Sequence, residues 1–180
     1  MEHKLKMISK EGIEEALSKA TLYRYLNEPE ETESICHDIL AVEPGHQLAL
    51  RMLGLAITDQ FTGQGWDRHV EVEEIFQRLS DAYERHYYMG LLYERRAKAQ
   101  MRTGRPANGF LGLFHEAMRH FEEAERIRPP QNDDAMLRWN RCVRLLQNFP
   151  AVEGAEQEVT LDDHDLAPAQ VMRSNARGPR

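Results

Sequence analysis

The residues whose types and spacing point most directly to chemistry are His115, Glu116 and His120. In one class of zinc hydrolase, two histidines four positions apart share a helix face and bind the metal, and a glutamate between them acts as general base. Here the histidines are five positions apart, which turns the second ring about 140° around a helix. The remaining histidines show no ligand spacing, so the sequence predicts no metal site and no catalytic histidine.

The glycines and cysteines also lack the context of a reactive site. Gly104 and Gly109 bound a loop without the Gly-Lys-Ser/Thr sequence that cradles phosphate. Cys36 falls on an apolar helix face, where packing is its expected role. Cys142 follows Arg141, whose charge would lower the thiol pKa, whereas partial burial favours a structural role, which is the better supported alternative. We therefore expect no cofactor and no enzymatic activity.

Composition narrows the classes of partner. The chain has 180 residues and a net charge of −7, with 23 basic against 30 acidic side chains. An acidic protein is a poor ligand for nucleic acid or an anionic membrane, because both attract basic surfaces. There is no apolar run of about 20 residues, as a membrane span requires, and no apolar core of a secretory signal. With only two cysteines, the simplest compartment is the cytoplasm.

The positions of apolar residues predict an all-α fold of about seven helices. Pro29 suits the first turn of a helix, and Pro44-Gly45 and Pro129-Pro130 end helices. Residues 103–109 have the composition of a loop. We expect a helical domain over residues 1–148 and a largely disordered, acidic, proline-containing tail over 149–180. The helices are predicted at about 8–26, 29–42, 46–60, 67–79, 80–101, 110–128 and 134–147.

Internal similarity indicates a repeat. Ala117, Phe121, Ala124 and Pro129 have the same spacing as Thr32, Cys36, Ile39 and Pro44. The segments 52–57 and 88–93 each place a large apolar residue before a glycine inside a helix, at Gly54 and Gly90. An interior glycine costs about 1 kcal/mol relative to alanine and is tolerated where a neighbouring helix comes close. The two glycines therefore predict two related helical hairpins.

These motifs resemble the tetratricopeptide repeat (TPR) family, over about residues 8–147. The resemblance rests on Leu53-Gly54-x-x-Ile57, Met89-Gly90-x-x-Tyr93, Ala20-x-x-Tyr23 and the run from Ala117 to Pro129. It implies antiparallel helical hairpins stacked as a short right-handed superhelix. The chain departs from the family pattern in three places: Thr32 and Cys36 replace the family's alanine and aromatic, residues 66–80 match poorly, and the interval from Gly90 to Ala117 is longer than in the family. We count three repeats, the middle one weak, and a final capping helix.

The resemblance also implies a site. In this family the first helix of each hairpin lines a concave groove that binds peptides or partner proteins. The family's carboxylate-clamp subclass has asparagines where this chain has Leu55 and Leu91, so chaperone tails are not expected partners. Arginine binds carboxylates through a bidentate fork, so the arginines on this face predict an acidic or C-terminal peptide ligand. Carried over by position, the partner-binding residues are Arg24, Arg51, Leu55, Tyr87, Leu91, Arg95, Arg141 and Arg144.

The expected function is therefore a non-catalytic scaffold for protein–protein interaction that binds a peptide or partner protein in this groove. The acidic tail segment 153–165 is a second candidate ligand, within the same chain, although a solvated tail is the simpler expectation. The main alternative function is a self-associating module, a homodimer subunit that buries the open ends of the superhelix.

Overall fold

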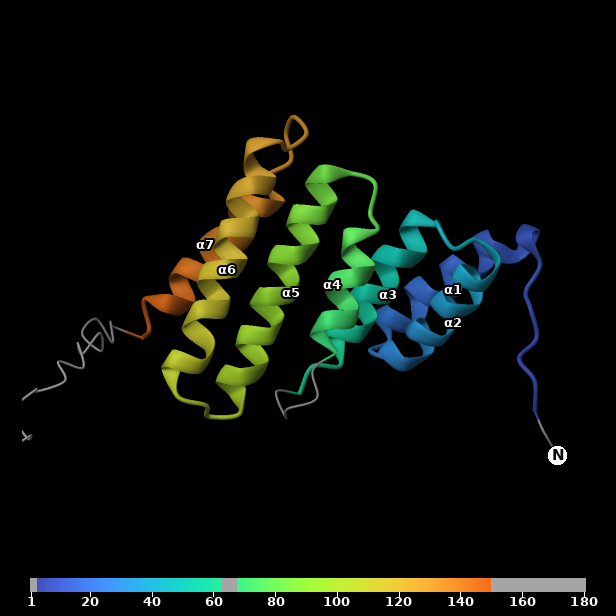
Figure 1. The fold of residues 1–180 in the computed structure, drawn as a ribbon, viewed down its shortest axis with the longest axis horizontal. Helices are drawn as coiled ribbons and strands as arrows, with labels where there is room; N and C mark the ends of the chain where they lie inside the picture. Colours follow the sequence, from blue (N-terminus) through green and yellow to red (C-terminus); the bar gives the residue numbers. More distant parts are fainter. Residues whose placement is uncertain (1–2, 63–67, 150–180) are drawn as a thin grey trace, which may run out of the picture.

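The computed structural model describes residues 3–62 and 68–149, and within these ranges the fold is all-helical (Figure 1). The predicted tail from residue 150 onward, including its acidic segment, lies outside the described residues, as does part of the segment 66–80. After a short 3-10 turn at Lys10–Gly12, the helices are α1 (Ile13–Tyr25), α2 (Pro29–Val42), α3 (Gln47–Asp59), α4 (His69–Gln77), α5 (Ala82–Arg102), α6 (Ala107–Arg126) and α7 (Asp134–Leu146).

The seven helices form a single elongated array. Successive helices pack against each other, so that α1 with α2, α3 with α4, and α5 with α6 form three hairpins, and α7 closes the far end (Figure 1). The first helices of the hairpins also contact one another in succession, α1 with α3, α3 with α5, and α5 with α7. We call the side of the array formed by α1, α3, α5 and α7 the groove face.

Local sequence sets most of the helix ends. Pro29 occupies the first turn of α2, where its missing N–H has no helical partner to lose. The Oδ1 atom of Asp81 accepts a hydrogen bond from the Glu84 amide at 2.9 Å and caps α5. Two predicted boundaries are wrong: α1 begins at Ile13 rather than near residue 8, and α6 begins at Ala107, so the last three residues of the predicted loop 103–109 are helical. The loop ends at Pro106, whose fixed φ suits the N-cap residue of a new helix.

Each hairpin carries a buried triad with spacing of four and three residues, on its second helix except for Leu79, which lies just after the end of α4. The weak match predicted for the middle hairpin reflects a longer connection after α3 rather than a lost pattern, since its triad is fully buried too. The triads are Thr32, Cys36 and Ile39; Val72, Phe76 and Leu79; and Ala117, Phe121 and Ala124, each at most 1% exposed.

The two interior glycines lie where the aromatic member of a triad meets the first helix of its hairpin. A Cβ atom built on Gly54 would lie 2.2 Å from the ring of Phe76, and one on Gly90 would lie 2.6 Å from the ring of Phe121. Any larger residue would overlap the ring, which is the close approach that the sequence predicted. In the first hairpin, the hydroxyl of Thr32 instead donates a hydrogen bond to the Ala20 carbonyl at 3.0 Å.

The third hairpin is longer than the others, because α5 has 21 residues and α6 has 20. This extra length explains the long interval between Gly90 and Ala117. Phe110 and Phe114 fill the added turns of α6 and are at most 2% exposed. Among the described residues, no helix is long and apolar enough to cross a membrane.

Candidate functional site

Ion pairs join the first helices along the groove face. Asp59, near the end of α3, accepts from the Nε atom of Arg24 in α1 at 2.7 Å and lies 2.5 Å from Nη1 of Arg95 in α5. One carboxylate therefore connects three successive hairpins. These contacts are only partly exposed, with 30%, 24% and 21% of the side chains of Arg24, Asp59 and Arg95 accessible, so solvent screens them less than it would surface pairs.

Arg95 is the most firmly held of the arginines. Its Nη1 atom also donates to the Leu55 carbonyl at 3.1 Å and to the Thr58 hydroxyl at 2.5 Å. Burial lowers the pKa of the Arg95 guanidinium, an effect that the charge of Asp59 opposes. Guanidinium has so high an intrinsic pKa that Arg95 stays charged, and its position is fixed before any ligand arrives.

A second pair links α3 and α5 closer to the start of both helices. Nη1 of Arg51 donates to Oε1 of Glu84 at 2.7 Å, and the same guanidinium lies 6.0 Å from the centre of the Tyr88 ring. An arginine at this distance from an aromatic face gains a cation–π attraction. Arg51 thus lies between a carboxylate and a ring, both on α5.

The α5 and α7 helices meet around Glu94, which is completely buried. Lys98 donates to its Oε1 atom, and Nη1 of Arg138 lies 3.6 Å from its Oε2 atom, which has no hydrogen-bond partner among the described residues. Burial is the largest single effect and disfavours the charge of Arg138, but the carboxylate of Glu94 and the hydroxyl of Tyr87 together raise the pKa of Arg138. A buried carboxylate of this kind costs stability unless cations stay beside it, which ties Lys98 and Arg138 to this place.

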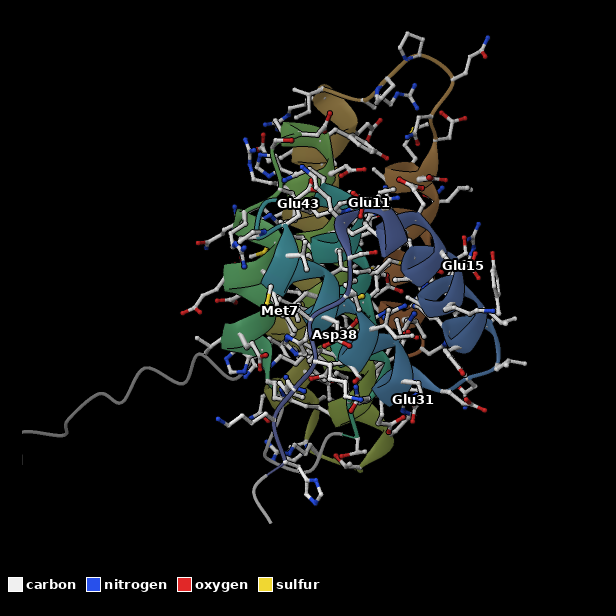
Figure 2. All side chains as sticks on the ribbon, turned by 90° about the vertical axis from the view of Figure 1, so that its right-hand side faces the viewer. Met7, Glu11, Glu15, Glu31, Asp38 and Glu43 are labelled. Atoms are coloured by element: carbon white, nitrogen blue, oxygen red, sulfur yellow. The ribbon has the colours of Figure 1, made fainter. Side chains whose placement is uncertain are left out.

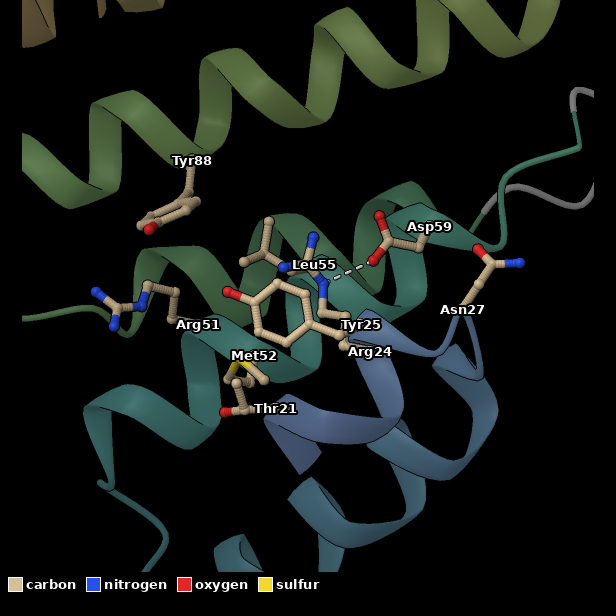
Figure 3. A pocket seen from close by; sticks show the side chains of 9 residues that line it. All are labelled: Thr21, Arg24, Tyr25, Asn27, Arg51, Met52, Leu55, Asp59 and Tyr88. Atoms are coloured by element: carbon tan, nitrogen blue, oxygen red, sulfur yellow. Dashed lines mark hydrogen bonds and ion pairs between the residues drawn. The ribbon is translucent and has the colours of Figure 1, made fainter. Parts of the chain in front are cut away.

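A cavity on the groove face lies between α1, α3 and α5 and has a volume of about 800 Å³. In Figure 3, Tyr25 and Tyr88 approach it from α1 and α5, and Arg24 points to Asp59. Tyr25 is 86% exposed, although it is aromatic. We call this the aromatic cavity; its lining residues are Thr21, Arg24, Tyr25, Asn27, Arg51, Met52, Leu55, Asp59 and Tyr88.

Two smaller cavities adjoin it. One, of about 250 Å³, lies between α3, α5 and α7; we call it the cationic cavity, and it is lined by Thr58, Asp59, Arg95, Lys98, Arg102 and Arg138. The other, of about 270 Å³, includes Tyr83, Tyr87 and Tyr88. Because Asp59 lines both the aromatic and the cationic cavity, these two lie next to each other along α3.

The structure brings together most of the residues predicted to bind a partner. Arg24, Arg51 and Leu55 line the aromatic cavity, and Arg95 lines the cationic cavity. Tyr87 lines the third cavity and stacks on Tyr83, with ring centres 5.8 Å apart.

Three of the predicted residues lie elsewhere. Leu91 is 4% exposed and lines none of these three cavities. Arg141 and Arg144 are exposed on α7 and line none of them either. The arginine that α7 supplies to the groove face is Arg138, one turn before Arg141.

Sequence reasoning did not identify which carboxylates pair with the arginines of the groove face. Arg24 and Asp59 are 35 positions apart, and Arg51 and Glu84 are 33 positions apart. A third pair, Arg68 with Glu33, is again 35 positions apart. These separations match the length of one hairpin, so opposite charges spaced by the repeat period are the signal that would have found them.

The histidine and cysteine side chains that were first considered for catalysis are packed against other described residues. His120 stacks on Tyr93 with ring centres 5.5 Å apart, and burial, followed by the charge of Arg119, lowers the pKa of its imidazole. Burial raises the pKa of both thiols, Cys36 and Cys142, to about 12, so neither forms a thiolate near neutral pH. No group of three or more histidine, cysteine or acidic residues there is arranged to hold a metal.

Comparison of the chain with models of known protein families and with curated proteins found no match. The resemblance to tetratricopeptide repeats therefore stays a prediction from the motifs, and the arrangement of hairpins is consistent with it.

Proposed function

We propose that this protein is a non-catalytic scaffold that binds a peptide segment of a partner protein on its groove face. The observation that carries the proposal is the aromatic cavity. It combines an exposed tyrosine, Tyr25, with the apolar Leu55 and Met52 and with two arginines. Tyrosine and arginine are the residues most often responsible for binding energy at protein interfaces.

The charges of the groove face favour an acidic segment. Each arginine lining the aromatic cavity already has one carboxylate partner, Asp59 for Arg24 and Glu84 for Arg51. An arginine has five N–H donors, so one carboxylate leaves donors for another. An acidic peptide would add its carboxylates to arginines that are already oriented, which lowers the entropy cost of binding.

The test is a peptide selection followed by titration calorimetry. A phage-displayed random peptide library is selected on the immobilised protein, and the enriched peptides are titrated into the wild type and into Tyr25→Ala. Because Tyr25 is 86% exposed, its removal leaves the stability within about 0.5 kcal/mol of the wild type. We expect the affinity to fall about tenfold or more, as for an interface hot spot.

The matched control is Val70→Ala on α4, which removes another exposed apolar side chain, 56% accessible, from the second helix of a hairpin. Peptides that bind Tyr25→Ala as tightly as the wild type, or a selection that enriches no peptide, would contradict the proposal. If both variants lost binding, the peptide would bind at a site other than the aromatic cavity, which would also contradict the proposal.

The alternative, self-association through the ends of the array, gains less support from the structure. The end formed by α1 and α2 presents Glu11, Glu15, Glu31, Asp38 and Glu43 toward the viewer in Figure 2. Two copies meeting there would bring like charges together, which opposes association. Light scattering over a wide concentration range decides between the two functions, since a concentration-independent monomer excludes the dimer.

A further inference from the structure

Among the described residues, the cationic cavity contains more positive charge than its acidic neighbours neutralise. Four cations, Arg95, Lys98, Arg102 and Arg138, line it together with a single carboxylate, that of Asp59. The cavity's nearest ion-pair partners do not restore the balance: Glu94 adds one negative charge and Arg24 one positive charge. Five cations thus face two carboxylates, in a chain whose net charge is −7.

The four cations converge from two helices. Arg95, Lys98 and Arg102 follow one another at steps of three and four, so they share one face of α5. Arg138 faces them from α7 and is held there by Glu94. The cavity volume of about 250 Å³ is that of about eight water molecules, which suits a small polyatomic anion.

The guanidinium of Arg95 is already held in place by the protein. Among the described residues, all hydrogen bonds of Arg95 use Nη1, toward Leu55, Thr58 and Asp59. The other edge of its planar fork therefore keeps donors for a ligand. Arg102, by contrast, is exposed, and its one hydrogen bond to a described residue is a long one of 3.3 Å to the Phe61 carbonyl, so it can turn to a ligand at little cost.

A surplus of three positive charges fits a phosphate group better than a carboxylate. A carboxylate brings one charge and two oxygens, whereas a phosphorylated side chain brings a charge of about −1.5 to −2 at pH 7 and three acceptor oxygens. Clusters of arginine are the usual means by which proteins recognise phosphorylated residues. The small volume favours a short side chain over the longer phosphotyrosine.

We propose that the cationic cavity binds a phosphoserine or phosphothreonine side chain of the partner peptide. The proposal rests on the proposed function, because the flanking residues of the same peptide would occupy the aromatic cavity. Asp59 borders both cavities, so a single extended segment reaches from one to the other along α3.

The test compares three fluorescein-labelled heptapeptide pools with randomised flanks and a fixed central residue: phosphoserine, serine or glutamate. Fluorescence anisotropy with the full chain measures their affinities at fixed ionic strength. We expect the phosphoserine pool to bind about tenfold tighter than the serine pool, with the glutamate pool between them. Equal binding of the phosphoserine and glutamate pools would overturn the phosphate assignment in favour of a carboxylate.

Arg102→Glu tests the location, because this exposed side chain can be reversed without touching the buried network. The control is Arg126→Glu on α6, which makes the same change in net charge at a side chain that is 66% exposed and outside the groove face. We expect the preference for phosphoserine to disappear in Arg102→Glu and to survive in Arg126→Glu. A preference that survives both changes, or is lost equally in both, overturns the proposed site.

Two further outcomes separate this inference from the function on which it rests. If the selected unphosphorylated peptides bind through Tyr25 and phosphoserine gives no gain, the scaffold function stands and the phosphate site is wrong. If inorganic phosphate alone binds as tightly as the phosphoserine pool, the cavity is a free-anion site and the peptide assignment is wrong.

Discussion

Replacing Gly54 with alanine tests the packing on which the whole array depends. The new methyl group would lie 2.2 Å from one carbon of the Phe76 ring and 2.6 Å from another. Phe76 is completely buried, so the ring has no free space to move into. Overpacking of this kind costs about 1–3 kcal/mol, and alanine returns about 1 kcal/mol through its better helix propensity. We expect a net loss of up to about 2 kcal/mol in the free energy of unfolding.

Gly112→Ala is the matched control, since it makes the same exchange inside α6 at an exposed position with no atom within 4 Å of the new methyl group. At Gly112 only the helix propensity changes, and we expect the free energy of unfolding to rise by about 1 kcal/mol. Urea unfolding of both variants, with the slope compared to the wild type, measures the two changes in stability. The two substitutions should therefore have opposite signs.

The double variant Gly54→Ala/Phe76→Leu assigns the effect to the ring. Leucine removes the two ring atoms nearest the methyl group, Cε1 and Cζ, so the combined loss should be smaller than the sum of the two single losses. The reasoning fails if Gly54→Ala stabilises the protein as Gly112→Ala does, or if the two losses simply add.

Three further predictions concern the core and its titratable groups. Phe121→Ala should lower the free energy of unfolding by about 3–5 kcal/mol and Ala124→Leu by about 1–3 kcal/mol, because both residues are completely buried; an unchanged melting temperature would contradict the hairpin. Since burial raises both thiol pKa values to about 12, Cys36 and Cys142 should react with iodoacetamide at pH 8 only after denaturant is added, and labelling of the native protein would show that they are accessible. Folding lowers the pKa of His120, chiefly by burial, so the unfolded chain takes up a proton at a higher pH than the folded chain does. The free energy of unfolding should therefore fall as the pH drops below about 6.5. In His120→Phe, the free energy of unfolding should fall less between about pH 7 and pH 5. Urea unfolding at equilibrium measures this fall, and an equal fall in the variant and the wild type would refute the prediction.

The helices were predictable because their signals are local. Apolar periodicity and the prolines at 29, 44 and 129 define six connections without any knowledge of tertiary structure. The middle hairpin was harder, because the triad of Val72, Phe76 and Leu79 lies farther from Gly54 than the corresponding triad lies from Ala20 in the first hairpin. A longer connection shifts the spacing between two helices while leaving the spacing within each helix intact.

The site was predictable only in part. Arg24, Arg51 and Arg95 were placed on the groove face by the resemblance to the repeat family, whose positions carry over from one first helix to the next. In the last helix, the arginine that lines the cationic cavity is Arg138, one turn before the predicted Arg141. Pairing of arginine with carboxylate depends on which helices are neighbours, and a single helix contains no information about that.

The position of Asp59 makes the two adjacent cavities energetically dependent on each other. Its two oxygens are divided between Arg24 and Arg95, so an anion that binds the remaining donors of either arginine repels this carboxylate. A shift of Asp59 away from that anion moves it towards the other arginine, which changes the donors that remain for a second ligand group. By thermodynamic linkage, if filling one cavity changes the affinity of the other, then filling the second cavity changes the affinity of the first by the same factor. A ligand that fills both cavities would therefore not bind with the sum of its two separate binding energies.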